Sequence, residues 1–188
     1  MWAAHCDEAG LIRGWEERGR EWRGFSTGGS KLLFRLGPAR APRLCVTEAA
    51  IDAMSLATLE QVRPDSLYLS TGGGWSPATD AAIRKLAAGA PALLVAATDN
   101  NRQGETYADR LTAMAFAIGC GFERLRPALE DWNADLQAAR AREQGEKKEG
   151  GQETLGCRMP AGRVKGEASP AARPLTRPGG EAAAGEGS

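Results

Sequence analysis

Acidic side chains recur in the middle of the chain, and each follows a short apolar run. Glu48 comes directly after residues 43–47, and Asp99 comes shortly after residues 92–97. Carboxylate and amide oxygens are ligands that Mg²⁺ and Mn²⁺ prefer. A bound Mg²⁺ can bridge phosphate oxygens and stabilise the negative charge that develops on them. This pattern therefore predicts a metal site suited to phosphoryl chemistry.

Three further side chains extend this candidate set. Asp52 follows Glu48 by one helical turn, so the two share a helix face, and Asp52 either ligates the metal or orients a ligand. Asn101 follows Asp99 by two residues, and its amide oxygen can ligate a cation without contributing charge. Asp131 lies in a third acidic turn. The candidate metal ligands are Glu48, Asp52, Asp99, Asn101 and Asp131, and Glu48 is also the candidate general acid or base.

Glycines form a second feature that could serve phosphate chemistry. Gly72, Gly73 and Gly74 follow residues 66–70, another apolar run. Glycine permits a tight turn because it has no Cβ. It also lets backbone N–H groups approach a phosphate closely. Both interpretations of Gly72, Gly73 and Gly74 are open from the sequence.

Each candidate ligand also has an ordinary structural explanation. Glu48 could be a first-turn acid favoured by a helix dipole. Asp99 and Asn101 could each be a helix N-cap. Asp131 can ligate a metal only if its turn faces the site, and Trp132 is expected to be a packing anchor rather than a base-stacking platform.

Regular alternation of strands and helices would position these residues. The sequence predicts strands at 43–47, 66–70, 92–97 and 122–125, and helices at 49–61, 77–88, 103–118 and 133–140. Such alternation predicts an α/β domain over residues 43–140, with a four-stranded parallel sheet and helices on both faces. Ligands bind such sheets at the carboxyl ends of the strands, where the candidate residues fall.

The flanking segments differ from this domain. Residues 1–42 are predicted to be β-rich, with turns at 7–10 and 28–30, and to be too small to fold alone; they could be the remnant of a larger N-terminal domain. Residues 141–188 contain no aromatic residue and few large aliphatic ones, so we expect a disordered low-complexity tail. The aromatic residues expected to pack the N-terminal segment are Trp2, Trp15, Trp22 and Phe25.

Composition excludes several function classes. Lys+Arg and Asp+Glu are both 24, so a protein that coats DNA non-specifically is not indicated. Residues 1–43 nevertheless hold eight basic and five acidic residues, whereas residues 44–140 hold eight and twelve. The single histidine, His5, argues against zinc sites of the usual His/Cys spacing. The four cysteines form no CxxC pair and no apolar stretch would span a bilayer, so we expect a cytoplasmic protein with reduced thiols and no membrane contact.

Three short motifs, in order, resemble those of the Toprim family. The run from Glu48 to Leu56 resembles the first motif, a Glu after a strand with an Asp four residues on. The run from Asp99 to Gly104 resembles the second, Asp-x-Asp with a nearby Gly, and Glu130–Asn133 resembles the acidic turn of primase-type members. Two departures stand out: Ala49 replaces the usual Gly, and Asn101 replaces the second Asp.

The resemblance implies a Rossmann-like Toprim fold that binds Mg²⁺ or Mn²⁺ and acts on DNA or RNA. The similarity is greatest to primase-like proteins of bacterial plasmids and integrated mobile elements. It implies nucleotidyl or phosphodiester transfer, by a primase-like nucleotidyltransferase or a nuclease, with a helicase or relaxase-type protein as a partner. Asn101 supports an alternative hypothesis: a catalytically degenerate module that binds nucleic acid or a replication or mobilisation partner.

Overall fold

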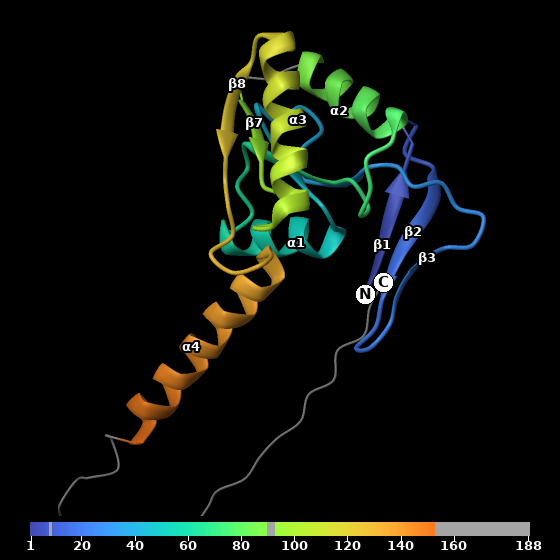
Figure 1. Cartoon of the computed structure of the whole chain (residues 1–188). Coiled ribbons are helices and arrows are strands. Elements are labelled where there is room, and N and C mark those ends of the chain that lie inside the picture. The colour runs from blue at the N-terminus through green and yellow to red at the C-terminus, as the bar shows by residue number, and fades with distance from the viewer. Residues whose placement is uncertain (8, 90–92, 153–188) are drawn as a thin grey trace, which may run out of the picture.

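The computed structural model describes residues 1–7, 9–89 and 93–152 of the chain. These residues form two sheets and four helices, whose arrangement is shown in Figure 1. The smaller sheet is antiparallel and has the order β1-β2-β3. It is built from β1 (Trp2–Cys6), β2 (Ile12–Arg18) and β3 (Arg23–Phe25). The larger sheet has the order β4-β6-β5-β7-β8. Its strands are β4 (Phe34–Leu36), β5 (Arg43–Thr47), β6 (Ser66–Ser70), β7 (Leu93–Ala96) and β8 (Gly121–Arg124).

The predicted four-stranded parallel sheet is confirmed. Strand β5 pairs in parallel with both β6 and β7, and β7 pairs in parallel with β8. A fifth strand, β4, joins this sheet antiparallel to β6, with Phe34 opposite Ser70. The sequence placed this run with the N-terminal segment, but Phe34 packs into the core of the larger sheet, which extends its edge.

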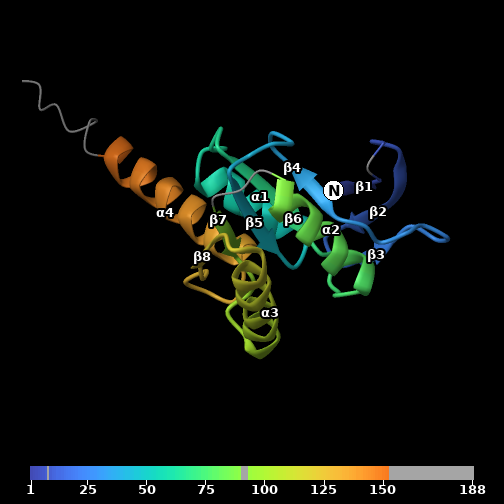
Figure 2. The same cartoon turned by 90° about the horizontal axis from the view of Figure 1, so that it is seen from above.

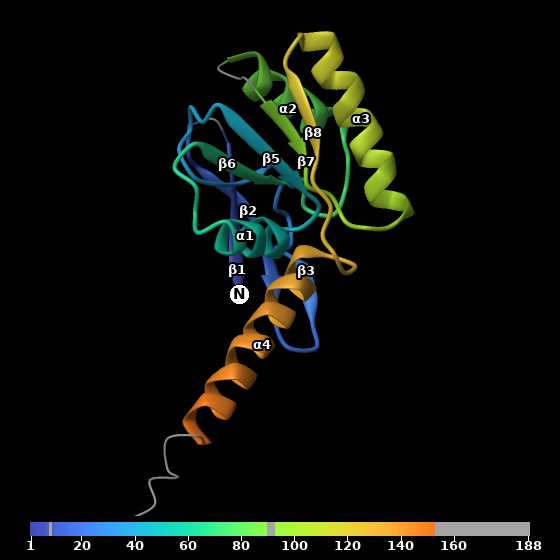
Figure 3. The ribbon, with the colours of Figure 1, turned by 90° about the vertical axis from the view of Figure 1, so that its left-hand side faces the viewer.

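Helices cover both faces of the larger sheet, as the strand–helix alternation predicts (Figures 2 and 3). Helices α2 (Pro77–Gly89) and α3 (Arg102–Ile118) pack on one face. Helix α1 (Ala50–Leu59) and the start of α4 (Trp132–Gln152) pack on the other. Two apolar cores therefore hold the sheet, which fixes the positions of the loops at its edges.

Small residues allow α1 to pack closely against the sheet. Ala50, Ala53 and Ala57 are buried together with Leu56. Leu59, the last residue of the helix, is 36% exposed. Alanine side chains are short, so they let the helix backbone come close to the sheet, and larger side chains lie at the edge of the contact.

The three N-terminal tryptophans are not packing residues, so that expectation is wrong. Trp2 is 82% exposed, Trp22 is 58% exposed and Trp15 is 41% exposed. Side chains alternate between the two faces of a strand. In β1 the buried positions are Ala3 and His5, which face the larger domain, so Trp2 projects from the opposite face.

The C-terminal helix extends further than the sequence indicated. Helix α4 continues past Arg140 to Gln152, where disorder was expected from residue 141. Residues 141–146 are exposed, so this part of the helix makes no core contact. It is rich in Ala, Arg, Glu and Gln, which have high helix propensity. The rest of the expected tail, residues 153–188, lies outside the described residues. No helix in the described ranges has the length and apolar character needed to cross a membrane.

Candidate active site

A cavity of about 510 Å³ lies at the carboxyl-terminal edge of β5, β6 and β7, where the parallel-sheet argument placed the site. It brings together four of the five candidate ligands, and its walls come from both sheets. From the larger domain it is lined by Glu48, Ala49, Asp52, Gly72, Gly73, Asp99, Glu130 and Asp131. From the N-terminal sheet and the segment after it the lining residues are Glu16, Glu17, Arg18, Arg23, Gly24, Phe25 and Lys31.

Two carboxylate oxygens in this cavity lack hydrogen-bond partners within the described structure. They are Oε1 of Glu48 and Oδ1 of Asp99, and both are buried. Burial of a polar atom without a partner is costly, so native proteins rarely leave such atoms unsatisfied. The two atoms belong to side chains that the sequence identified separately, at the ends of β5 and β7.

Burial, and then repulsion between the carboxylates, raises the pKa of three acidic side chains in the cavity. Burial raises the pKa of Glu48 to about 7, with a further contribution from the negative charge of Asp99. Burial also raises the pKa of Asp52 to about 7, helped by Asp99 and Asp131. The pKa of Asp99 is raised to about 6 by burial and then by Asp131 and Glu130. A bound cation would relieve this repulsion and favour the charged carboxylates.

The donor set fits a cation that is only partly held by protein. Among the described residues, no three His, Cys, Asp or Glu side chains converge to form a complete metal site. Mg²⁺ is commonly bound by one or two carboxylates and completes its shell with waters and substrate phosphates. Two unsatisfied oxygens from Glu48 and Asp99 match that mode of binding. They are all-oxygen donors, which suits Mg²⁺ or Mn²⁺ rather than a soft metal.

Asp52 and Asp131 border the cavity but already accept hydrogen bonds. Oδ1 of Asp52 accepts from the backbone N–H of Asn133 at 3.4 Å. Oδ1 of Asp131 accepts from the backbone N–H of Ala134 at 2.7 Å, in the first turn of α4. Each therefore also stabilises the start of α4, and each retains a second oxygen.

The other candidates, Asn101 and the glycines at 72–74, are either outside the cavity or already hydrogen-bonded within the protein. Asn101 is the N-cap of α3: its Oδ1 accepts from the backbone N–H of Gly104 at 2.9 Å, and Asn101 does not line the cavity. Gly72 and Gly73 line the cavity, but their N–H groups donate to Ser70 Oγ at 3.0 Å and to the Glu48 carbonyl at 2.8 Å. Their φ angles are +69° and +75°, so a tight turn explains these glycines. Gly74 does not line the cavity.

Gly104 has a steric role that the motif did not explain. A Cβ at this position would lie 2.0 Å from the carbonyl oxygen of Asp99. The carbonyl of Gly104 accepts from Thr98 Oγ1 at 2.7 Å. The first turn of α3 therefore packs directly on the Asp99 backbone, which only glycine permits.

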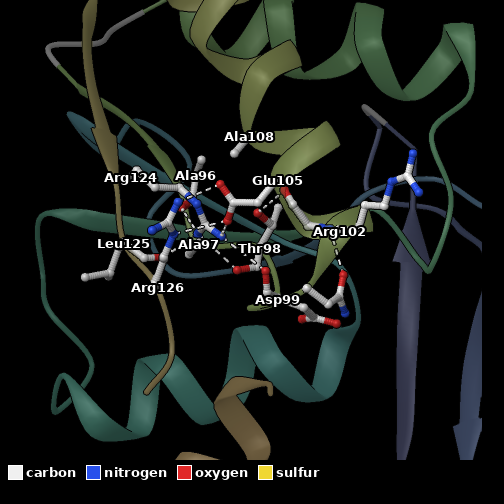
Figure 4. Close-up of polar contacts among 12 residues, drawn as sticks. Ala96, Ala97, Thr98, Asp99, Arg102, Glu105, Ala108, Arg124, Leu125 and Arg126 are labelled. Atoms are coloured by element: carbon white, nitrogen blue, oxygen red, sulfur yellow. Dashed lines mark hydrogen bonds and ion pairs between the residues drawn. The ribbon is translucent and has the colours of Figure 1, made fainter. Parts of the chain in front are cut away.

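Arg124 is a residue at this site that sequence reasoning missed. Its guanidinium group binds the end of β7 and the loop beyond it (Figure 4). It donates to the carbonyl oxygens of Ala96 at 2.9 Å, Thr98 at 3.0 Å, Asp99 at 3.1 Å and Leu125 at 2.7 Å. It also pairs with Glu105 at 2.7 Å, and Glu105 pairs with the more exposed Arg126. The only sequence signal was an arginine within a predicted strand.

Basic residues of the N-terminal segment face the carboxylates. Arg18, Arg23 and Lys31 line the cavity. The positive charge of Arg18 lowers the pKa of Asp52 and of Asp99, against the larger effect of burial. The excess of basic residues in residues 1–43 was the sequence signal, but it did not identify these side chains. The cavity thus has an acidic wall in the larger domain and, opposite it, a wall that carries three basic side chains beside the carboxylates of Glu16 and Glu17.

Comparison with known families agrees with this geometry. Residues 45–136 match the family described as Toprim-like. The chain carries a Toprim-like domain. Residues 1–41 match a second family, described only as a protein of unknown function (DUF3991). None of the curated proteins compared with the chain matches it.

Solved primase structures share this fold. The primase fragment of the bacteriophage T7 primase-helicase protein is 20% identical, with a TM-score of 0.50, over 77% of this chain and 60% of that one. Primase domains in a structure of the bacteriophage T7 lagging-strand DNA polymerase, bound to an RNA/DNA hybrid and dTTP, are 19% identical, with a TM-score of 0.53, over 77% of this chain and 74% of that one. The Toprim-like domain therefore resembles the primase catalytic region in fold.

Proposed function

We propose that the chain is a metal-dependent Toprim module that acts on nucleic acid, with primase-like nucleotidyl or phosphodiester transfer as its reaction. The observation that carries this proposal is the pair of buried, unsatisfied oxygens on Glu48 and Asp99 in one cavity. The basic side chains opposite them supply charge for phosphate groups. A metal site beside a phosphate-binding wall is what phosphoryl transfer on nucleic acid requires.

Glu48 and Asp99 would hold Mg²⁺ or Mn²⁺ in this proposal. Asp131 and Asp52 would support them through their remaining oxygens and the negative charge they add. When bound, the cation would neutralise negative charge on the phosphate oxygens. The alternative role for Glu48 is that of general acid or base, with Asp99 and Asp131 holding the cation; the pKa of Glu48 is raised to about 7 in the metal-free site, which suits proton transfer near neutral pH. Arg18 and Lys31 would orient the phosphates from the opposite wall.

The bacteriophage T7 structure supports the choice of nucleic acid as substrate, because it contains primase domains together with a DNA polymerase, an RNA/DNA hybrid and dTTP. We extend that substrate class to this chain as part of the proposal. A setting in a plasmid or integrated mobile element, with a helicase or relaxase-type partner, remains part of the same proposal. The choice of a helicase as partner is supported by the bacteriophage T7 primase fragment, which comes from a primase-helicase protein.

A second candidate function is a non-catalytic module that docks nucleic acid or a replication partner. Two observations favour it. The amide oxygen of Asn101 is committed to the cap of α3. The N–H groups of Gly72 and Gly73 already have acceptors, so they are not free to bind a phosphate in this conformation.

Calorimetry with Mn²⁺ tests the metal site. We expect the parent protein to bind Mn²⁺ and Asp99→Ala to lose at least about tenfold in affinity, because a shared ligand and its charge are removed together. Asp109→Ala removes an exposed carboxylate elsewhere on α3 and should bind like the parent. Equal binding by all three proteins, or no binding by the parent, would overturn the assignment.

Primer-synthesis and nicking assays with Mg²⁺ and Mn²⁺ in parallel then separate the two functions. Activity that disappears in Asp99→Ala supports the catalytic module. Metal binding with neither activity, on single-stranded and duplex DNA and RNA, favours the docking module instead.

A further inference from the structure

His5 and Glu16 join the N-terminal sheet to the loops that form the cavity. Nε2 of His5 lies 2.9 Å from Oε1 of Glu16. The other oxygen of Glu16, Oε2, accepts from the backbone N–H of Ala50 at 3.3 Å. Both carboxylate oxygens of Glu16 are therefore engaged, although Glu16 lines the same cavity as Glu48. This distinguishes Glu16 from the two ligand candidates, which each leave one oxygen unsatisfied.

Helix α1 lacks a cap of its own. Its N-cap residue is Ala49, which has no side chain able to accept a hydrogen bond. The first N–H groups of a helix have no partner within the helix and need an external acceptor. Glu16 supplies one from another sheet, and its negative charge suits the positive end of the helix dipole. Ala50 lies two residues after Glu48, so this contact bears directly on the loop that carries the site.

His5 is held rigidly on its other side. Its ring is fully buried, and Nδ1 donates to the carbonyl of Leu32 at 2.5 Å. The ring meets Phe25 edge-on, with centroids 5.1 Å apart and planes at 89°. A Cβ at Gly72 would lie 3.0 Å from His5 Cε1, so the turn after β6 also packs on this ring. His5 thus fixes Glu16 against the start of α1 and the turn after β6.

We propose that His5 and Glu16 form a positioning pair, through which the N-terminal sheet caps α1 and sets the loop that carries Glu48. The N-terminal sheet is then a working part of the site rather than an independent module. Glu16 positions the metal-binding carboxylate and does not itself ligate the cation. The effect on metal affinity rests on the function proposed above, whereas the cap on α1 does not.

Glu16→Ala, with Glu17→Ala as its control, tests the pair. Glu17 is the adjacent carboxylate and lines the same cavity, but it binds Trp15 Nε1 rather than α1. Loss of a hydrogen bond to a charged acceptor should speed amide hydrogen exchange at Ala50 roughly tenfold in Glu16→Ala. It should weaken Mn²⁺ affinity by a similar factor, measured well below the thermal transition. Glu17→Ala should leave exchange at Ala50 unchanged and affect Mn²⁺ binding less.

Three outcomes separate this inference from the function on which it partly rests. If the parent binds no Mn²⁺, the metal assignment fails, and exchange at Ala50 still tests the cap. If Glu16→Ala and Glu17→Ala behave alike in exchange, the positioning pair is overturned. If exchange at Ala50 rises but Mn²⁺ affinity matches that of Glu17→Ala, the cap exists but does not position Glu48, and the proposal is also overturned.

A conservative variant covers the case in which Glu16→Ala does not fold. Glu16→Gln keeps an oxygen for the Ala50 N–H and removes the charge, and Glu17→Gln removes the same charge beside it. We expect Glu16→Gln to protect Ala50 better than Glu16→Ala does. Since His5 is the chain's only histidine, its ring ¹⁵N resonances report directly on the contact with residue 16. Resonances that shift in Glu16→Gln but not in Glu17→Gln support the pair, and resonances unchanged in both overturn it.

Discussion

The loops that carry Glu48 and Asp99 follow the neighbouring parallel strands β5 and β7. Each loop contains a buried carboxylate oxygen without a hydrogen-bond partner. Their supports differ. The Glu48 loop (residues 48–49) is held from outside its own β–α unit, by the turn after β6 and by Glu16 of the N-terminal sheet. The Asp99 loop (residues 97–101) is held from within the domain. Arg124 on the adjacent strand β8 binds its carbonyl oxygens, Trp132 donates to the Ala97 carbonyl, and the N–H of Asn100 donates to the Glu130 carbonyl.

Because their contacts differ, the two loops should respond to different changes in the protein. Removal of the N-terminal sheet should disturb Glu48 and leave Asp99 in place. A change at Arg124 should disturb Asp99 and the strands beside it. A site built from two independently supported carboxylates can therefore be probed one side at a time, which the following four predictions do, from the largest expected effect to the smallest.

Arg124→Met should have the largest effect. It removes the arginine that binds the Thr98 and Asp99 carbonyl oxygens in the loop after β7, and the free energy of unfolding should fall by about 3 kcal/mol or more. Chemical denaturation measures this. Arg126→Met removes the exposed partner of the same Glu105 and should change stability little. Similar losses in both variants would show that the ion pair, not the carbonyl contacts, supports the Asp99 loop.

Gly104→Ala tests the steric contact behind the Asp99 loop. The added Cβ would lie 2.0 Å from the Asp99 carbonyl, so we expect a loss of about 2 kcal/mol in the free energy of unfolding. Gly145→Ala is the matched control, because no atom lies near its Cβ position within α4. That change should stabilise the protein by about 0.5–1 kcal/mol through helix propensity. An unchanged free energy of unfolding in Gly104→Ala would mean that the Asp99 loop can shift to accommodate the added methyl group.

Asp52→Asn should stabilise the metal-free protein in a pH-dependent way. The pKa of Asp52 rises from 3.8 to about 7 on folding, so the folded state binds this proton more tightly. The free energy of unfolding therefore falls as pH rises from about 4 to about 7. Asn removes this penalty, and we expect a gain on the order of 1–2 kcal/mol at pH 8 and none at pH 3. Thermal melts of both proteins across this range measure the difference; a gain independent of pH would point to another cause.

Asn101→Asp should have the smallest effect. The Asn101 oxygen caps α3, and Asp and Asn are nearly equal caps, so stability should change by less than about 0.5 kcal/mol. Metal affinity should also stay within about threefold of the parent, since Asn101 does not line the cavity. A tenfold gain in Mg²⁺ affinity would show instead that the side chain turns toward the metal and that the loop is more adaptable than its contacts suggest.

Much of the domain was predictable because its elements are locally encoded. The strands at 43–47 and 66–70 have the bounds that the sequence indicated. The end of α3 at Gly119, which adopts a left-handed conformation, was predictable for the same reason. Trp132 is buried and donates to the Ala97 carbonyl at 2.7 Å, so its predicted packing role is confirmed. Such features depend on propensity and periodicity within a few residues.

Long-range contacts were not predictable in the same way. The distance along the chain from Glu16 to Ala50, or from Arg124 to Ala96, gives no sign that these residues meet. The tryptophans of the N-terminal sheet were misjudged because strand alternation reveals two faces but not which one is covered.

The sequence by itself determined the order of strands and helices and the carboxylates that follow them, because apolar periodicity and turn residues act locally. Only the tertiary structure decided which of those side chains share a cavity. In the folded chain Asn101 caps α3, and Glu48 and Asp99 each have a buried carboxylate oxygen without a hydrogen-bond partner. Basic side chains of the N-terminal segment line the same cavity. The physical reason is that burial, loss of hydrogen-bond partners and charge repulsion arise only when distant segments pack together.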